Sequence, residues 1–333
     1  MAQTTTYGGQ ALIEGVLIRG RNALAVAIRR PDGRIVGATE RLDSGFHGSR
    51  WARLPFMRGL VVLYETLVVG IRWLVRSANV AAAEEGVELG KGSIAVMLTV
   101  TFAAAVGLFF LLPLFLASVT AGAADSDLVQ HLVEGAIRVA IFLAYLALIA
   151  RLPDVRRVFQ YHGAEHMTIH ALEAGEPLVT ETIRRHPTAH PRCGTEFLVV
   201  VIILSILAFS LVGRQEPLVM VGSRIVLIPV IAGVGYEILR FGARHRTNGL
   251  VRAIMAPGIW VQLITTKQPT DDMIEVAIVA TEQALLADGE PVPAGSVRPD
   301  FEPLELAGGG QPVPAAPIAT APLPGDPPGE PEG

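Results

Sequence analysis

The sequence predicts an all-α integral membrane protein with about four transmembrane helices, interfacial helices, a small N-terminal β-hairpin element and a disordered C-terminal tail. Composition is the first observation: 51% of the 333 residues are hydrophobic and 17% are charged, whereas soluble domains carry roughly 25% charged residues. The second is a series of apolar runs close to the roughly 20 residues that cross a bilayer. The third is a final segment rich in proline and glycine, such as PLPGDPPGEPEG, which has too little apolar surface to fold.

The first fifty residues predict a β element. Two short runs with partial alternation, ALAVAIRR and RIVGATERL, are separated by PDG, and proline and glycine preset the dihedrals of a hairpin turn. Ahead of them, YGGQALIEGVLIRG begins with Gly8 and Gly9, which we interpret as a tight backbone turn. Glu14 and Arg19 could cover a site, but charged residues are usually solvated, and we expect that here.

Residues 59–75, GLVVLYETLVVGIRWLV, form an apolar run that Glu65 and Arg72 interrupt. The run is marginal for a span and predicts an interfacial, re-entrant or protein-packed helix. Glu65 has two interpretations of equal weight. It faces a partner or a cavity, or it lies on the surface of an interfacial helix.

Four further runs predict transmembrane helices. Glu134 and Arg138 lie four residues apart in the second run, on one helical face, so they can pair. Arg224 interrupts the fourth run and could be a snorkelling charge. The short run APGIWVQLI predicts an interfacial helix. The predicted spans are residues 93–120, 131–150, 197–212 and 217–239.

The distribution of lysine and arginine predicts the orientation. These residues are frequent before the first span, between the second and third, and after the fourth, and they are scarce in the other two loops. By the positive-inside rule, both termini and the middle loop are cytoplasmic in a multi-pass protein of the cell membrane. The predicted divisions are a cytoplasmic β element (1–50), an interfacial or re-entrant region (51–92), a transmembrane hairpin (93–150), a cytoplasmic His/Cys loop with a helix (151–196), a second transmembrane hairpin (197–240), a cytoplasmic or interfacial region (241–288) and the tail (289–333).

The stretch YHGAEHMTIH, residues 161–170, holds three of the chain's eight histidines. Helix start and stop signals enclose it, with Pro153 before it and Gly175 after it. On this helix His162 and His166 are one turn apart and face the same way. Two imidazoles need this spacing to bind one metal ion.

Glu165 lies beside these histidines and completes the motif H-x-x-E-H. This is the inverted zinc-protease pattern, in which the glutamate is the general base for a metal-bound water. His170 cannot share an ion with His162, because roughly 12 Å of helix rise separates them. Glu173 is similarly remote from His162.

The loop HPTAHPRCG, residues 186–194, offers further ligands in His190 and Cys193. Its prolines keep it out of a helix, so it can fold back onto the histidine helix. With His162 and His166, these residues could complete a tetrahedral zinc site. Four bound ligands would make a closed, structural site, and three would leave a position for a catalytic water. The pattern does not decide between them, or between metal binding and histidines that cap helix ends.

Four stretches resemble the YqhQ-like family, bacterial integral membrane proteins of unknown function. They are YGGQALIEGVLIRG, FQYHGAEHMTIHALEAGEPL, HPRCGTEFL and VRAIMAPGIWVQLITTKQPTDDMIEVAI, in this order over residues 7–285. The family is labelled a predicted metal-dependent enzyme, without a substrate. Carried over by position, the resemblance implies a role for His162, Glu165, His166, His190 and Cys193.

The sequence therefore predicts a hydrolase-like, metal-dependent enzyme at the cytoplasmic face, with Glu165 catalytic and zinc as cofactor. One alternative is a membrane scaffold or assembly protein with a structural metal site. Another is a transporter or channel component that uses Glu65, Glu134 and Arg138. The expected partner is the lipid bilayer. A net charge of −4 does not indicate a nucleic-acid partner. The substrate and homo-oligomerisation stay open.

Overall fold

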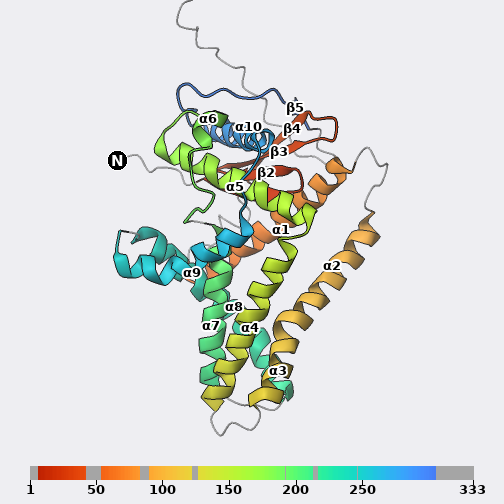
Figure 1. Ribbon diagram of the computed structural model, residues 1–333, viewed down its shortest axis with the longest axis vertical. Coiled ribbons are helices and arrows are strands. Elements are labelled where there is room, and N and C mark those ends of the chain that lie inside the picture. Colours follow the sequence, from red (N-terminus) through yellow and green to blue (C-terminus); the bar gives the residue numbers. More distant parts are fainter. Residues whose placement is uncertain are drawn as a thin grey trace, which may run out of the picture.

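The computed structural model is mostly helical, with a small sheet at one end and long apolar helices extending away from it (Figure 1). The sheet is accompanied by α5 (Pro153–Ala174), α6 (Thr180–Ile183) and α10 (Asp271–Asp288). This arrangement separates a layer rich in charged side chains from an apolar helical bundle. The structure describes residues 7–42, 54–82, 90–121, 127–191, 193–212, 217–245 and 247–304.

The sheet has five strands in sequence order, of which the first four form an antiparallel meander. The predicted hairpin is confirmed, and Gly33 takes a positive φ of 85° in its turn. The hairpin is part of a larger sheet than expected, because two more N-terminal strands pair with it. The strands are β1 (Gly8–Leu12), β2 (Gly15–Arg19), β3 (Ala23–Arg29), β4 (Ile35–Arg41) and β5 (Glu302–Pro303).

Strand β5 corrects the prediction that a disordered tail begins at residue 289. It pairs in parallel with β4, and the Leu304 N–H donates to Gly37 O at 2.7 Å. Upstream of it, Ser296 Oγ accepts from the Leu178 N–H at 2.8 Å. These hydrogen bonds hold a segment that composition alone marks as unfolded. The rest of the predicted tail, residues 305–333, lies outside the described residues.

Both faces of the sheet are buried. On one face, the inward side chains of β2 and β3, such as Val16 and Ala25, pack with residues of α5 and α10 into the main core. On the other face, Leu24 and Val26 pack around Trp73, which is fully buried. Trp73 belongs to α1 (Met57–Ala81), so this helix is the second cover of the sheet.

Helix α1 is therefore a protein-packed helix with an exposed apolar side. Its Ser77 Oγ accepts from the Ile13 N–H at 3.2 Å. Its Glu65 Oε2 lies 3.1 Å from Arg19 Nη2 of β2. Tyr64 and Leu67, in contrast, are each 57% exposed. The first interpretation of Glu65, that it faces a partner, is confirmed.

Among the described residues, four helices are long and apolar enough to cross a membrane. They match the predicted spans to within a few residues, and many of their apolar side chains are exposed, for example Leu211 at 88%. A bilayer would cover such surface. The shorter apolar helix α9 (Gly249–Thr265) contains the predicted interfacial run. The spans lie in α2 (Lys91–Val106) continued by the π-helix η3 (Gly107–Leu111) and α3 (Leu112–Ala121), in α4 (Asp127–Ile149), in α7 (Gly194–Val212) and in α8 (Pro217–Arg244).

A buried charge cluster joins two of these spans. The predicted pair within α4 is confirmed, with Arg138 Nη2 at 2.6 Å from Glu134 Oε1. Arg224 of α8 does not snorkel, because it is buried and lies 2.9 and 3.2 Å from the two Glu134 oxygens. Arg138 also donates to the carbonyl of Phe109 in η3 at 3.1 Å. One carboxylate thus compensates two guanidinium groups between the helices.

We expect Glu134→Gln to destabilise the protein by about 3–5 kcal/mol, because it leaves two buried arginines without their carboxylate. The matched control is Glu237→Gln, which removes the partner of Arg58 at a more exposed ion pair (2.6 Å) and should cost about 1 kcal/mol or less. Thermal unfolding in detergent measures both. Equal shifts in melting temperature would contradict the central role of Glu134.

Candidate metal centre

The helix that carries the histidines begins and ends where the sequence predicts. Pro153 is its first residue, and Gly175 caps its C-terminus in the left-handed conformation, with φ of 69°. The turns between them are buried against the sheet and α10, with Tyr161 and Met167 fully covered. Because one side of α5 is fixed in the core, the histidine side is fixed as well.

The structure brings His162, His166 and Cys193 together. Each offers one ligand atom, and these atoms all lie within 4.8 Å of one another. His162 Nε2 is 3.2 Å from Cys193 Sγ. Two ligands on a tetrahedral zinc, with bonds of roughly 2.0–2.3 Å, are separated by roughly 3.3–3.8 Å, so a small movement of the side chains would suit a bound ion.

Hydrogen bonds orient both imidazoles toward the cysteine. His162 Nδ1 lies 2.9 Å from Thr265 O at the end of α9, and His166 Nδ1 lies 2.6 Å from Thr188 O in the loop. A carbonyl oxygen only accepts, so each Nδ1 carries the proton and each Nε2 keeps its lone pair. Metal-binding histidines typically have such backbone partners. Burial, followed by the nearby His162, lowers the pKa of His166 to about 2, which keeps this ring neutral.

The Cys193 thiol is held in the protonated form by its surroundings. Burial raises its pKa to about 12, although hydrogen bonds from Thr195 oppose the shift. Thr195 Oγ1 and N lie 3.1 and 3.4 Å from Sγ. A bound divalent cation would favour the thiolate instead. The side chains therefore fit a zinc ion in chemistry as well as in spacing.

Glu165 is buried beside this group, with its Oε2 at 3.4 Å from His166 Nε2. Burial raises its pKa to about 7, while the nearby His162 and a hydrogen bond from the Gly9 backbone oppose the shift. A carboxyl group with this pKa exchanges protons readily near neutral pH. This property suits the predicted role of general base.

Gly8 and Gly9 lie in strand β1, so the predicted tight turn is wrong. A Cβ atom at Gly9 would lie 2.3 Å from Leu17 O and 3.0 Å from Glu165 Cγ. The absence of a side chain lets β1 approach its neighbouring strand and α5 at the same point. The sequence required glycine here for packing, not for unusual dihedrals.

The expectation that Glu14 and Arg19 are solvated is also wrong. The Glu14 carboxylate accepts from Arg157 of α5 at 2.6 and 2.5 Å, and from the Tyr161 hydroxyl at 3.2 Å. Arg19 pairs with Glu65 of α1. The two charges thus attach the sheet to the helices on its opposite faces.

His190 does not join the group in which the sequence placed it. Its ligand atom lies within 4.8 Å of those of His170 and Glu173, in a second group. Its ring is still close to the first group, with centroids of His166 and His190 at 5.7 Å. Sequence reasoning missed His170 and Glu173, although their spacing of three residues puts them on one helical face.

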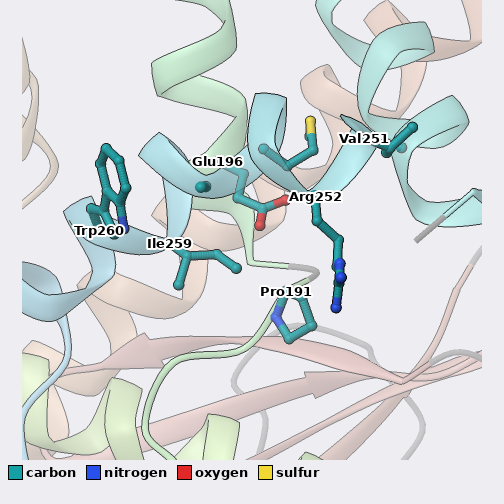
Figure 2. Close-up of a pocket in the computed structure, with 9 residues that line it drawn as sticks. Pro191, Glu196, Val251, Arg252, Ile259 and Trp260 are labelled. Atoms are coloured by element: carbon teal, nitrogen blue, oxygen red, sulfur yellow. The ribbon is translucent and has the colours of Figure 1, made fainter. Parts of the chain in front are cut away.

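A largely apolar pocket of about 410 Å³ lies on the far side of the same loop (Figure 2). Pro191 and Glu196, which precede and follow Cys193, form part of its wall. Figure 2 shows Glu196 with Arg252 and Ile259 around the hollow. The pocket is lined by Pro191, Glu196, Gly242, Val251, Arg252, Met255, Ala256, Ile259 and Trp260, from the loop, α7, α8 and α9.

Comparisons with known proteins agree with the resemblance found in the sequence. A family described as "Protein of unknown function (DUF1385)" matches residues 54–287. The "Uncharacterized protein YqhQ" of Bacillus subtilis (strain 168) is 31% identical over 292 residues, which cover 84% of this chain and 92% of that protein. No solved structure matches.

We expect Cys193 to react slowly with iodoacetamide in protein that has been treated with a chelator. At pH 8 a thiol with a pKa of about 12 has about a thousand-fold less of the reactive thiolate than an ordinary cysteine. The chain has one cysteine, so mass spectrometry reports this site alone. The control is the same protein in denaturant. Similar labelling rates in the two states would contradict the buried, protonated thiol.

Proposed function

The chain belongs to the DUF1385 family of proteins of unknown function, and we propose that it is a membrane-anchored, metal-dependent enzyme of the hydrolase type. One observation carries the proposal: a His162, His166 and Cys193 group stands beside the buried Glu165. Three protein ligands are typical of catalytic zinc sites, because the fourth position then stays available to the reaction.

Two imidazoles and a thiolate are a ligand set that suits zinc. When bound, zinc would supply Lewis acidity and lower the pKa of a coordinated water. The Glu165 carboxylate would accept the proton from the attacking water and then give it to the leaving group. The Gly9 backbone and the buried surroundings hold this carboxylate in place and keep its pKa near 7. The carbonyls of Thr265 and Thr188 hold the two rings.

We place the reaction at the cytoplasmic surface of the cell membrane, on the basis of the lysine and arginine distribution. The pocket beside the cysteine loop supports a substrate with an apolar part. It lies where the ends of α7 and α8 meet α9, and Trp260 and Leu263 of α9 are each 64% exposed. An amphiphile held in the bilayer could enter there without leaving an apolar environment.

The described residues give less support to the two alternatives. A structural site would use His190 as fourth ligand, but its ligand atom groups with those of His170 and Glu173. A transport pathway would need Glu65 and Glu134 in one polar cavity. Glu65 pairs instead with Arg19 of the sheet, and Glu134 with the arginines inside the bundle.

We expect protein purified without an affinity-tag metal to contain zinc that His166→Ala loses and Glu165→Gln retains. The reason is that His166 supplies a ligand atom, whereas Glu165 acts on protons. Elemental mass spectrometry measures the metal, and His245→Ala, at an exposed histidine that follows the end of α8, is the matched control. Glu165→Gln should also lower hydrolysis of acyl-chain ester probes by about 100-fold or more. The proposal fails if zinc is absent after reconstitution, or if His166→Ala and wild type bind it equally.

A further inference from the structure

We propose that His170, Glu173 and His190 form a second cation site, separate from the one in the proposed function. Their three ligand atoms lie within 4.8 Å of one another. His190 Nε2 is 3.4 Å from Glu173 Oε1, and the ring centroids of His170 and His190 are 4.5 Å apart. A separation of 3.4 Å is long for a hydrogen bond. It is the separation of two ligands on one tetrahedral ion with bonds of roughly 2.0–2.1 Å.

The rings of this group are positioned by contacts outside it. His170 Nε2 lies 3.0 Å from Ala189 O, and this hydrogen bond fixes the orientation of the ring. The side-chain amide of Gln262 in α9 makes two hydrogen bonds with the His190 backbone. It accepts from the His190 N–H at 2.9 Å and donates to the His190 carbonyl at 3.0 Å. The ring of His170 and the backbone of His190 are thus held by groups outside the site.

The side chains of this group have the burial and the charge expected of a cation site that solvent can reach. The His190 side chain is 4% exposed, whereas that of Glu173 is 38% exposed, so an ion can reach the inner nitrogens along the carboxylate. One carboxylate reduces the charge of a divalent ion. Two imidazoles and a carboxylate suit a first-row divalent metal such as zinc, manganese or iron, and no sulfur takes part.

The two sites share no ligand and differ in chemistry. The first includes a thiolate, and the second only nitrogen and oxygen. A metal in the second site would join the C-terminal half of α5 to residues 188–190 of the loop.

The test is a cobalt titration of the full-length protein in detergent. A cobalt–thiolate bond gives a charge-transfer absorption band that nitrogen and oxygen ligands do not. We expect two equivalents to bind. Cys193→Ser should remove the band. His170→Ala and the isosteric Glu173→Gln should each remove one equivalent and retain the band.

Glu176→Gln, at a neighbouring acidic residue, is the matched control and should keep both equivalents. Circular dichroism and size-exclusion chromatography establish that each variant folds. Wild type could also bind cobalt without any charge-transfer band, and Glu173→Gln could remove one equivalent. That result would support the second site and count against the first. If wild type binds only one equivalent of cobalt, and Glu173→Gln keeps both that equivalent and the charge-transfer band, the second site is overturned. Two equivalents in both His170→Ala and Glu173→Gln would overturn it as well.

Discussion

The arrangement of the candidate centre depends on close backbone approach to helix α5 from two directions. A Cβ atom at Gly163 would lie 2.1 Å from Lys267 O, and one at Gly9 would lie 3.0 Å from Glu165 Cγ. The Lys267 N–H also donates to Phe159 O at 2.8 Å. Because the helix is enclosed at successive turns, it can neither rotate nor slide without collision. The directions of its histidines and of Glu165 are therefore set by packing.

The centre lies where the long apolar helices meet the sheet layer. The loop with Cys193 leads directly into α7, and Thr265, which orients His162, ends α9. Gln262 of α9 holds the backbone of His190. The helix on the sheet thus supplies most ligand atoms, and the apolar helices with the loop that leads into them supply the cysteine and much of the hydrogen bonding. Neither layer contains the centre alone.

Local signals in the sequence predicted most elements, and they failed where a partner comes from far along the chain. The spans, the hairpin and α5 with its H-x-x-E-H motif follow from hydropathy, turn residues and caps, which are properties of neighbouring residues. The strand position of Gly9, the ion pair of Glu14 with Arg157 and the pairing of β5 all depend on contacts between distant segments. The assignment of the candidate ligands to two groups also depended on contacts between distant segments. His162 and His166 were paired by helical spacing, but the grouping of His190 depends on how the loop folds back.

The charge cluster in the bundle bears on the order in which the apolar helices assemble. Helix α4 is synthesised first, and its Glu134 and Arg138 can neutralise each other within one helix. Arg224 has no acidic residue three or four positions away in its own sequence, so α8 must find compensation in a helix made 90 residues earlier. The docking of α8 onto α4 is therefore coupled to the compensation of its charge. Of the four candidate spans the one in α8 is the least apolar, and its buried arginine also selects the helix beside which α8 packs.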